Sequence, residues 1–113
     1  WASGENAANT HTVELTFPFP VEIDRAGLYW SFNGNQGLWM TSQRVQVQAF
    51  SNGVFSDVGV MTRTADGPLS FVRFGAVTTT KLRFLQPPNM GPPSYSGLIW
   101  FTEAFYDMGF DPQ

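Results

Sequence analysis

Glycine and proline interrupt this chain so often that no stretch is left for a long helix. The 113 residues include eleven glycines and eight prolines, and these two residue types are the strongest local breaks in regular structure. Between the breaks apolar and polar side chains alternate, so that Val13, Leu15 and Phe17 share one face of their segment. A period of two is typical of a half-buried strand. The spacing therefore predicts an all-β chain.

Segments of the same kind predict about seven strands. They are residues 11–17, 21–31, 42–50, 54–61, 69–74, 78–85 and 98–106. Because proline cannot donate to a central ladder, Pro18 and Pro20 are expected to end the first strand. Asn52-Gly53 favours a type I′ hairpin turn, which needs positive φ angles. Short strands at this spacing predict an antiparallel β-sandwich, formed by residues 1–113 as a single domain.

Composition excludes several classes of function. The chain has no cysteine, which removes disulfides, thiolate nucleophiles and cysteine-ligated zinc. A net charge of −3 leaves no basic surplus for nucleic acid or an anionic membrane. The one histidine, His11, begins a strand, and the nine acidic residues are scattered singly near turns. The sequence therefore favours a non-catalytic protein.

Two predicted loops, residues 31–41 and 86–97, carry the aromatic and amide side chains that suit a sugar ligand. An aromatic ring can stack on the apolar face of a sugar, and neighbouring amides can bond to its hydroxyl groups. The candidate ligand-binding residues are Asn33, Asn35, Gln36, Trp39 and Tyr95. Two other roles stay open for Trp39 and Met40, which can fold back over the open end of the sandwich or contact a second subunit.

Other large or charged side chains have plainer expected roles. Trp30 and Trp100 lie in apolar strands and are expected in the core. Lys81 and Arg83 alternate on one strand face. We expect solvent around them or ion pairs with Glu103 or Asp107, and a ligand contact is the alternative.

Six segments together resemble the discoidin family, also called the coagulation factor 5/8 type C domain, and its carbohydrate-binding relatives. They are Trp-Ala-Ser at 1–3, and residues 11–15, 20–30, 41–48, 77–84 and 99–106, in the family's order. The resemblance implies a galactose-binding-domain-like, jelly-roll-like sandwich of seven to eight strands. It also implies a secreted, non-catalytic module that binds a neutral glycan, often as part of a larger glycoside hydrolase. The lack of cysteine favours a bacterial member over an animal one.

The resemblance carries two further expectations. Family members hold a structural calcium ion, and the matching residue of the closing strand is Glu103, the only candidate metal ligand. The chain starts at the Trp-x-Ser element, where the family has an earlier stretch. We therefore expect either a homo-oligomer or coverage of the exposed apolar surface by residues 1–10.

Two alternatives to glycan binding remain. One is a membrane- or protein-adhesion module that uses Phe32, Leu38, Trp39 and Met40 as a hydrophobic spike, although the negative net charge disfavours an anionic membrane. The other is a purely structural, oligomerising sandwich.

Overall fold

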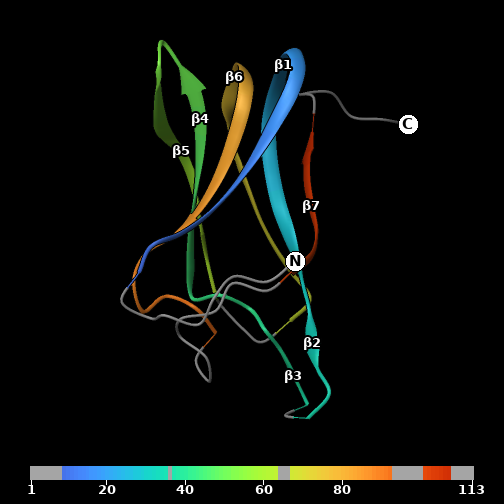
Figure 1. Cartoon of the computed structure of the whole chain (residues 1–113). Coiled ribbons are helices and arrows are strands. Elements are labelled where there is room, and N and C mark those ends of the chain that lie inside the picture. Colours follow the sequence, from blue (N-terminus) through green and yellow to red (C-terminus); the bar gives the residue numbers. More distant parts are fainter. Residues whose placement is uncertain (1–8, 36, 64–66, 93–100, 108–113) are drawn as a thin grey trace, which may run out of the picture.

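Two long strands carry most of the fold (Figure 1). The computed structural model describes residues 9–35, 37–63, 67–92 and 101–107, the last range by its backbone. The strands are β1 (His11–Trp30), β2 (Phe32–Asn33), β3 (Leu38–Trp39), β4 (Arg44–Ser51), β5 (Val54–Thr62), β6 (Leu69–Gln86) and β7 (Phe101–Asp107). One antiparallel sheet has the order β5-β4-β6-β1-β7, and β2 pairs with β3 alone. No helix occurs in these ranges, so the described chain is all-β.

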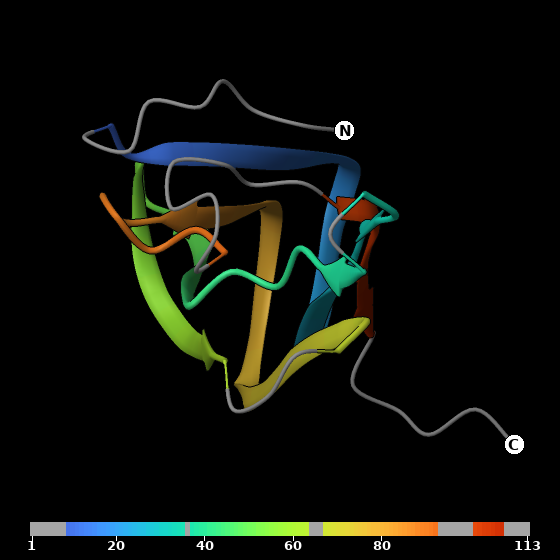
Figure 2. The same ribbon diagram turned by 90° about the horizontal axis from the view of Figure 1, so that it is seen from below.

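Both long strands belong to two layers. The first half of β1, residues 11–16, pairs with residues 81–86 of β6, next to β4 and β5. Its second half, residues 21–30, pairs with residues 69–79 and with β7. Figure 2 shows β1 and β6 turning sharply between these halves, so one sheet folds over onto itself. The result is an antiparallel β-sandwich whose corners are made by strands that pass from layer to layer.

The prolines sit at the corner of β1 rather than at the end of a strand. Four residues, 17–20, lie opposite Thr80 alone in the register of β1 with β6. A bulge of this kind leaves backbone groups unpaired, so Pro18 and Pro20 cost the ladder no hydrogen bond. The prediction that they end the strand was wrong, because they bend it instead.

The two strands expected at 69–74 and 78–85 are one strand, β6. A second irregularity places residues 74–76 opposite Asp24. At the corner Thr79 is buried. Its hydroxyl donates to the carbonyl oxygen of Phe50 (2.7 Å) or of Lys81 (2.9 Å), and its oxygen accepts from the N–H groups of Phe50 (3.1 Å) and Lys81 (3.2 Å). That side chain satisfies the backbone groups that the bend would leave open.

Alternation along the strands places the core as the sequence predicted. Val45, Val47 and Ala49 of β4 are buried, while the residues between them are not. Trp30 is 1% exposed, as expected, and Trp100 lies outside the described residues. The packed cluster is Phe17, Val21, Ile23, Ala26, Leu28, Trp30, Val45, Val47, Met61, Leu82 and Phe84. The Asn-Gly hairpin is confirmed, with φ angles of 52° and 83° at Asn52 and Gly53.

Candidate functional site

Three connecting segments are tied together at one end of the sandwich, the lower end in Figure 1. Gln43 links them. Its backbone N–H donates to the carbonyl of Met90 (2.7 Å), its side-chain amide donates to the carbonyl of Gly91 (3.0 Å), and its own carbonyl accepts from Arg63 N–H (3.0 Å). These bonds join the segments that follow β3, β5 and β6. The joined segments make a fixed base at this end of the sandwich.

The hairpin of β2 and β3 projects from that base (Figure 1). Phe32 pairs with Trp39, and Asn33 pairs with Leu38. The hairpin is closed at its root by a hydrogen bond from Met40 N–H to the carbonyl of Ser31 (2.8 Å). Met40 is fully buried there, as expected of a side chain that folds back over the end of the sandwich. Trp39 stays partly exposed. This short hairpin lies inside the segment predicted as an irregular loop.

The hairpin presents two aromatic rings side by side. Phe32 and Trp39 pack edge to face, with ring centroids 5.0 Å apart and an interplanar angle of 68°, a preferred geometry for aromatic pairs. Phe32 is 50% exposed, whereas Trp39 is only partly exposed. Phe32 is therefore the more accessible ring and Trp39 supports it. The sequence pattern could not show which of the two rings is more exposed, because their exposure depends on how β2 and β3 pair.

The amides predicted for ligand contact lie at the tip of the same hairpin. Asn33 accepts a hydrogen bond at its side-chain oxygen from Asn35 N–H (3.0 Å), which is an Asx turn. Its carbonyl accepts from the N–H of Gly37 (2.8 Å), whose φ of 67° favours glycine. The turn uses the side-chain oxygen of Asn33 and leaves its Nδ2 group to donate. The Asn35 side chain is exposed.

The structure thus brings together Asn33, Asn35 and Trp39 on one hairpin. Gln36 and Tyr95 lie outside the described residues. Glu103 pairs with Tyr29 through the backbone of β7, and its side chain is also outside them. In the described ranges, three or more histidine or carboxylate groups nowhere gather as a metal site would need. Calcium binding at Glu103 therefore stays a prediction.

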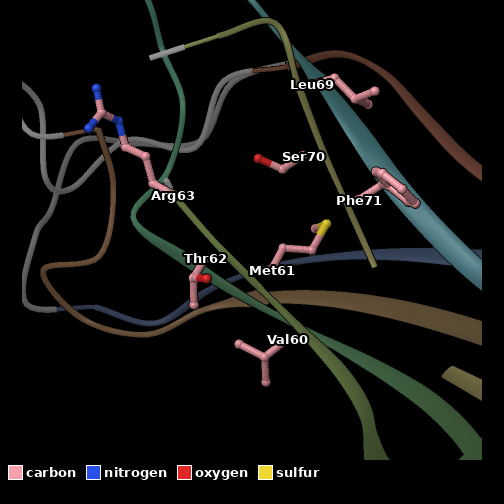
Figure 3. Close-up of a pocket in the computed structure, with 7 residues that line it drawn as sticks. All are labelled: Val60, Met61, Thr62, Arg63, Leu69, Ser70 and Phe71. Atoms are coloured by element: carbon pink, nitrogen blue, oxygen red, sulfur yellow. The ribbon is translucent and has the colours of Figure 1, made fainter. Parts of the chain in front are cut away.

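A cavity of about 370 Å³ opens at the same end, between the end of β5 and the start of β6 (Figure 3). It is lined by Val60, Met61, Thr62, Arg63, Leu69, Ser70 and Phe71. Figure 3 shows the Arg63 guanidinium pointing away from the hollow. The hydroxyl of Ser70 accepts a hydrogen bond from the indole of Trp30 (2.8 Å). The cavity wall thus mixes apolar side chains with polar groups, and the Ser70 hydroxyl already bonds to a core side chain.

The sequence singled out none of these lining residues. Leu69 and Phe71 are 41% and 50% exposed, and they occupy the outward positions of an alternating strand. The alternating pattern expects polar residues at outward positions. Apolar residues found there were the signal that could have identified this surface.

Solved structures of carbohydrate-binding modules share this fold. The family 32 module of NanJ from C. perfringens, solved with galactose, superposes with a TM-score of 0.72 at 13% identity over 94% of this chain and 74% of its own. The two family 32 modules of ZmpB from Clostridium perfringens, solved with GalNAc, give 0.73 at 15% identity over 94% of this chain and 26% of theirs. Chitosan-binding module 1 of a Paenibacillus sp. IK-5 chitosanase/glucanase gives 0.66 at 18% identity over 88% and 70%.

No family model matches the sequence, and no curated protein matches it either. At these identities the likeness to solved structures establishes the fold, which is that of galactose-binding-domain-like modules. Within the described ranges, no helix is both long and apolar enough to span a membrane.

Proposed function

We propose that this chain is a non-catalytic carbohydrate-binding module that binds a neutral glycan on the β2–β3 hairpin. Phe32, supported edge-on by Trp39, supplies the surface on which a sugar ring stacks. The amide of Asn35 at the hairpin tip bonds to its hydroxyl groups. Asn33 shares the opposite face of the hairpin with Leu38, so its Nδ2 group reaches only a ligand that extends around the tip. Gln36 and Tyr95 are proposed as further contacts.

The observation that carries the proposal is the exposed aromatic pair on a hairpin with a fixed root. A large apolar ring at 50% exposure costs solubility unless it packs or binds something. The root is held by buried Met40 and by the Thr41 hydroxyl, which donates to the carbonyl of Gly67 (2.6 Å). A ring held in place before binding loses little conformational freedom on contact with a ligand. The fold shared with galactose-, GalNAc- and chitosan-binding modules supports the same function.

Calorimetric titration with galactose, GalNAc and chitosan oligomers tests the proposal. We expect the Phe32→Ala variant to bind the preferred sugar at least about tenfold more weakly, which corresponds to about 1.4 kcal/mol. Trp39→Ala should weaken binding too, since it removes the support of Phe32. The matched control is Phe19→Ala, because Phe19 is 63% exposed at the corner of β1 and not on the β2–β3 hairpin. Binding that survives Phe32→Ala, or that falls equally with Phe19→Ala, would refute the hairpin site.

A membrane- or protein-adhesion function is the second candidate. Phe32 on β2 and Leu38 on β3 are 50% and 38% exposed. Phe32 pairs with Trp39, which follows Leu38 in the sequence. Neighbouring side chains of a strand point to opposite faces. One face of the hairpin therefore carries Phe32 and Trp39, and the other face carries Leu38. Sedimentation with neutral and anionic liposomes separates the candidates. Lipid binding that Leu38→Ser abolishes, without any sugar binding, would favour adhesion.

The proposal extends to the setting of the module. We propose that residues 1–113 act as one domain of a larger secreted glycoside hydrolase, as the chitosan-binding module does in its chitosanase/glucanase. The discoidin family and a bacterial source remain part of the same proposal.

A further inference from the structure

A band of cationic and aromatic side chains crosses the outer face of β4, β5 and β6, far from the hairpin. Inward residues of these strands, such as Val47 and Leu82, are buried in the core. Their outward neighbours in sequence, Gln48 and Arg83, lie opposite each other in the register of β4 with β6. The band continues toward the β4–β5 turn, which Figure 1 places at the opposite end from β2 and β3.

Arg83 is held in a fixed orientation at the centre of this band. Its guanidinium carbon lies 4.1 Å from the centroid of the Phe55 ring. Its Nε donates to the side-chain oxygen of Gln48 at 2.7 Å. Gln48 is oriented in turn by donating to one oxygen of Asp57 (2.8 Å), and Gln46 donates to the other oxygen (2.9 Å). Ring and amide together fix the plane of the guanidinium before any ligand arrives.

This clamp, formed by Phe55 and Gln48, leaves one edge of the Arg83 guanidinium available. Only Nε is engaged by another side chain in the described part of the protein, so the two terminal nitrogens keep their donors for a ligand. A planar guanidinium with paired donors matches the two oxygens of a carboxylate or sulfate. An arginine ordered in this way by the fold loses less rotamer freedom when it binds such a group.

A second cation stands beside the first. Lys81 is two residues along the same strand face, which corresponds to about 7 Å. Its ammonium lies 4.9 Å from the centroid of Phe50. Phe50 and Phe55 pack edge to face with centroids 5.1 Å apart, so the two rings form one support under both cations.

The carboxylates near this pair differ in what they do. Asp57 accepts hydrogen bonds on both oxygens from amides, and so it serves the clamp. Glu14 lies opposite Arg83 in the register of β1 with β6 and is exposed. No ion pair joins Glu14 and Arg83 in the described part of the chain. Glu14 therefore opposes an incoming anion and limits its affinity.

We propose that Arg83 and Lys81 form a second binding site, which takes an oxyanion carried by an acidic polysaccharide. The Arg83 terminal nitrogens pair with a carboxylate or sulfate oxygen, and Lys81 contributes a second positive charge. The half-buried rings of Phe50 and Phe55 border the apolar face of the sugar that carries the anion. The protein's net charge is −3, so such binding would come from this local geometry and not from bulk attraction.

Affinity measurements with heparin and with polygalacturonate test the proposal and distinguish sulfate from carboxylate. We expect Arg83→Gln and Lys81→Ala each to weaken binding about tenfold or more. Arg83→Lys keeps the charge but loses the stacked, paired geometry, and it should weaken binding nearly as much. Glu14→Gln removes the opposing charge and should strengthen binding.

The matched control is Arg73→Gln, which changes the net charge equally on the exposed face of the other layer. We expect it to leave binding within about twofold of the unaltered protein, since it removes only long-range, screened attraction. Equal losses in the Arg73 and Arg83 variants would overturn the proposal. So would an unchanged affinity in Glu14→Gln, or the absence of binding to either polymer. Phe32→Ala should not affect this site, which separates it from the glycan site on the hairpin.

Discussion

Gly59 of β5 lies directly against Val72 of β6, across the interior between the two layers. A Cβ placed on residue 59 would lie 3.0 Å and 3.1 Å from the two methyl carbons of Val72, and 3.4 Å from the Phe74 ring. Gly59 pairs with Val47 in the inner register of β4 and β5, and Val72 pairs with Ala26. The absence of a side chain at residue 59 is what lets the edge of one layer close onto the other.

We expect Gly59→Ala to lower the free energy of unfolding by about 1–3 kcal/mol, the usual cost of overpacking. Val72 is β-branched and cannot rotate away cheaply. Chemical denaturation measures the loss. The control is Gly75→Ala, since nothing lies within 4 Å of a Cβ at that position. If both variants are equally stable, the closeness of residues 59 and 72 does not limit packing.

The hydrogen bond from the Trp30 indole to the Ser70 hydroxyl, at 2.8 Å, gives a second prediction. Trp30 is 1% exposed, so Ser70→Ala should leave a buried donor unsatisfied at a cost of about 1–3 kcal/mol. Thermal unfolding and the Trp fluorescence maximum report the change. Ser56→Ala, on an exposed position of β5, is expected to be nearly neutral. A similar melting temperature for both variants would count against a structural role for this bond.

Acid sensitivity should involve Asp24. A hydrogen bond from the Arg25 side chain lowers the pKa of the Asp24 carboxyl, and the charges of Arg25 and Arg73 act in the same direction. A carboxyl whose pKa is lower in the folded state stabilises the fold above its unfolded pKa, near 4. That contribution is lost as pH falls through the lower folded value. Stability should therefore drop less steeply below about pH 4 in Asp24→Asn than in the unaltered protein. Parallel curves of melting temperature against pH would contradict this.

Self-association remains a prediction. Tyr29, Leu69 and Phe71 are 40%, 41% and 50% exposed on the outer face of the layer that contains β7, and grouped apolar residues favour contact with a partner. Analytical ultracentrifugation should show a homo-oligomer that Phe71→Arg converts to monomer. Sedimentation of the unaltered chain as a 12.6 kDa monomer at every concentration would exclude it.

Local pattern was sufficient for the strands and the tight turn. Alternation in β4 identified its buried face, and Asn52-Gly53 determined the hairpin, because both depend on neighbours in sequence. The corners were missed for the opposite reason. Whether Pro18 ends a strand or occupies a bulge depends on how β6 bends beside it, and no local signal carries that information.

The same limit applies to side-chain partners. Lys81 and Arg83 were correctly placed on one face of a strand, but the contact of Arg83 with Gln48 was not predicted, and the side chains of Glu103 and Asp107, the expected ion-pair partners, lie outside the described residues. β7 pairs with the second half of β1, whereas Arg83 lies beside β4 and bonds to Gln48. Which strand lies next to β6 is a matter of topology, which alternation does not encode.

Within the described residues β1 pairs only with β6 and β7, and this bears on the order in which strand contacts can form during synthesis. Among the described strands β1 comes first in the sequence, and both its partners, β6 and β7, come after β4 and β5. The β4–β5 hairpin, joined by its own turn, can form while β1 still has no partner. Contacts between distant segments form slowly because loop closure must come first. The longest strand therefore has no described pairing partner until β6 has been synthesised, whereas β4 and β5 can already be paired with each other.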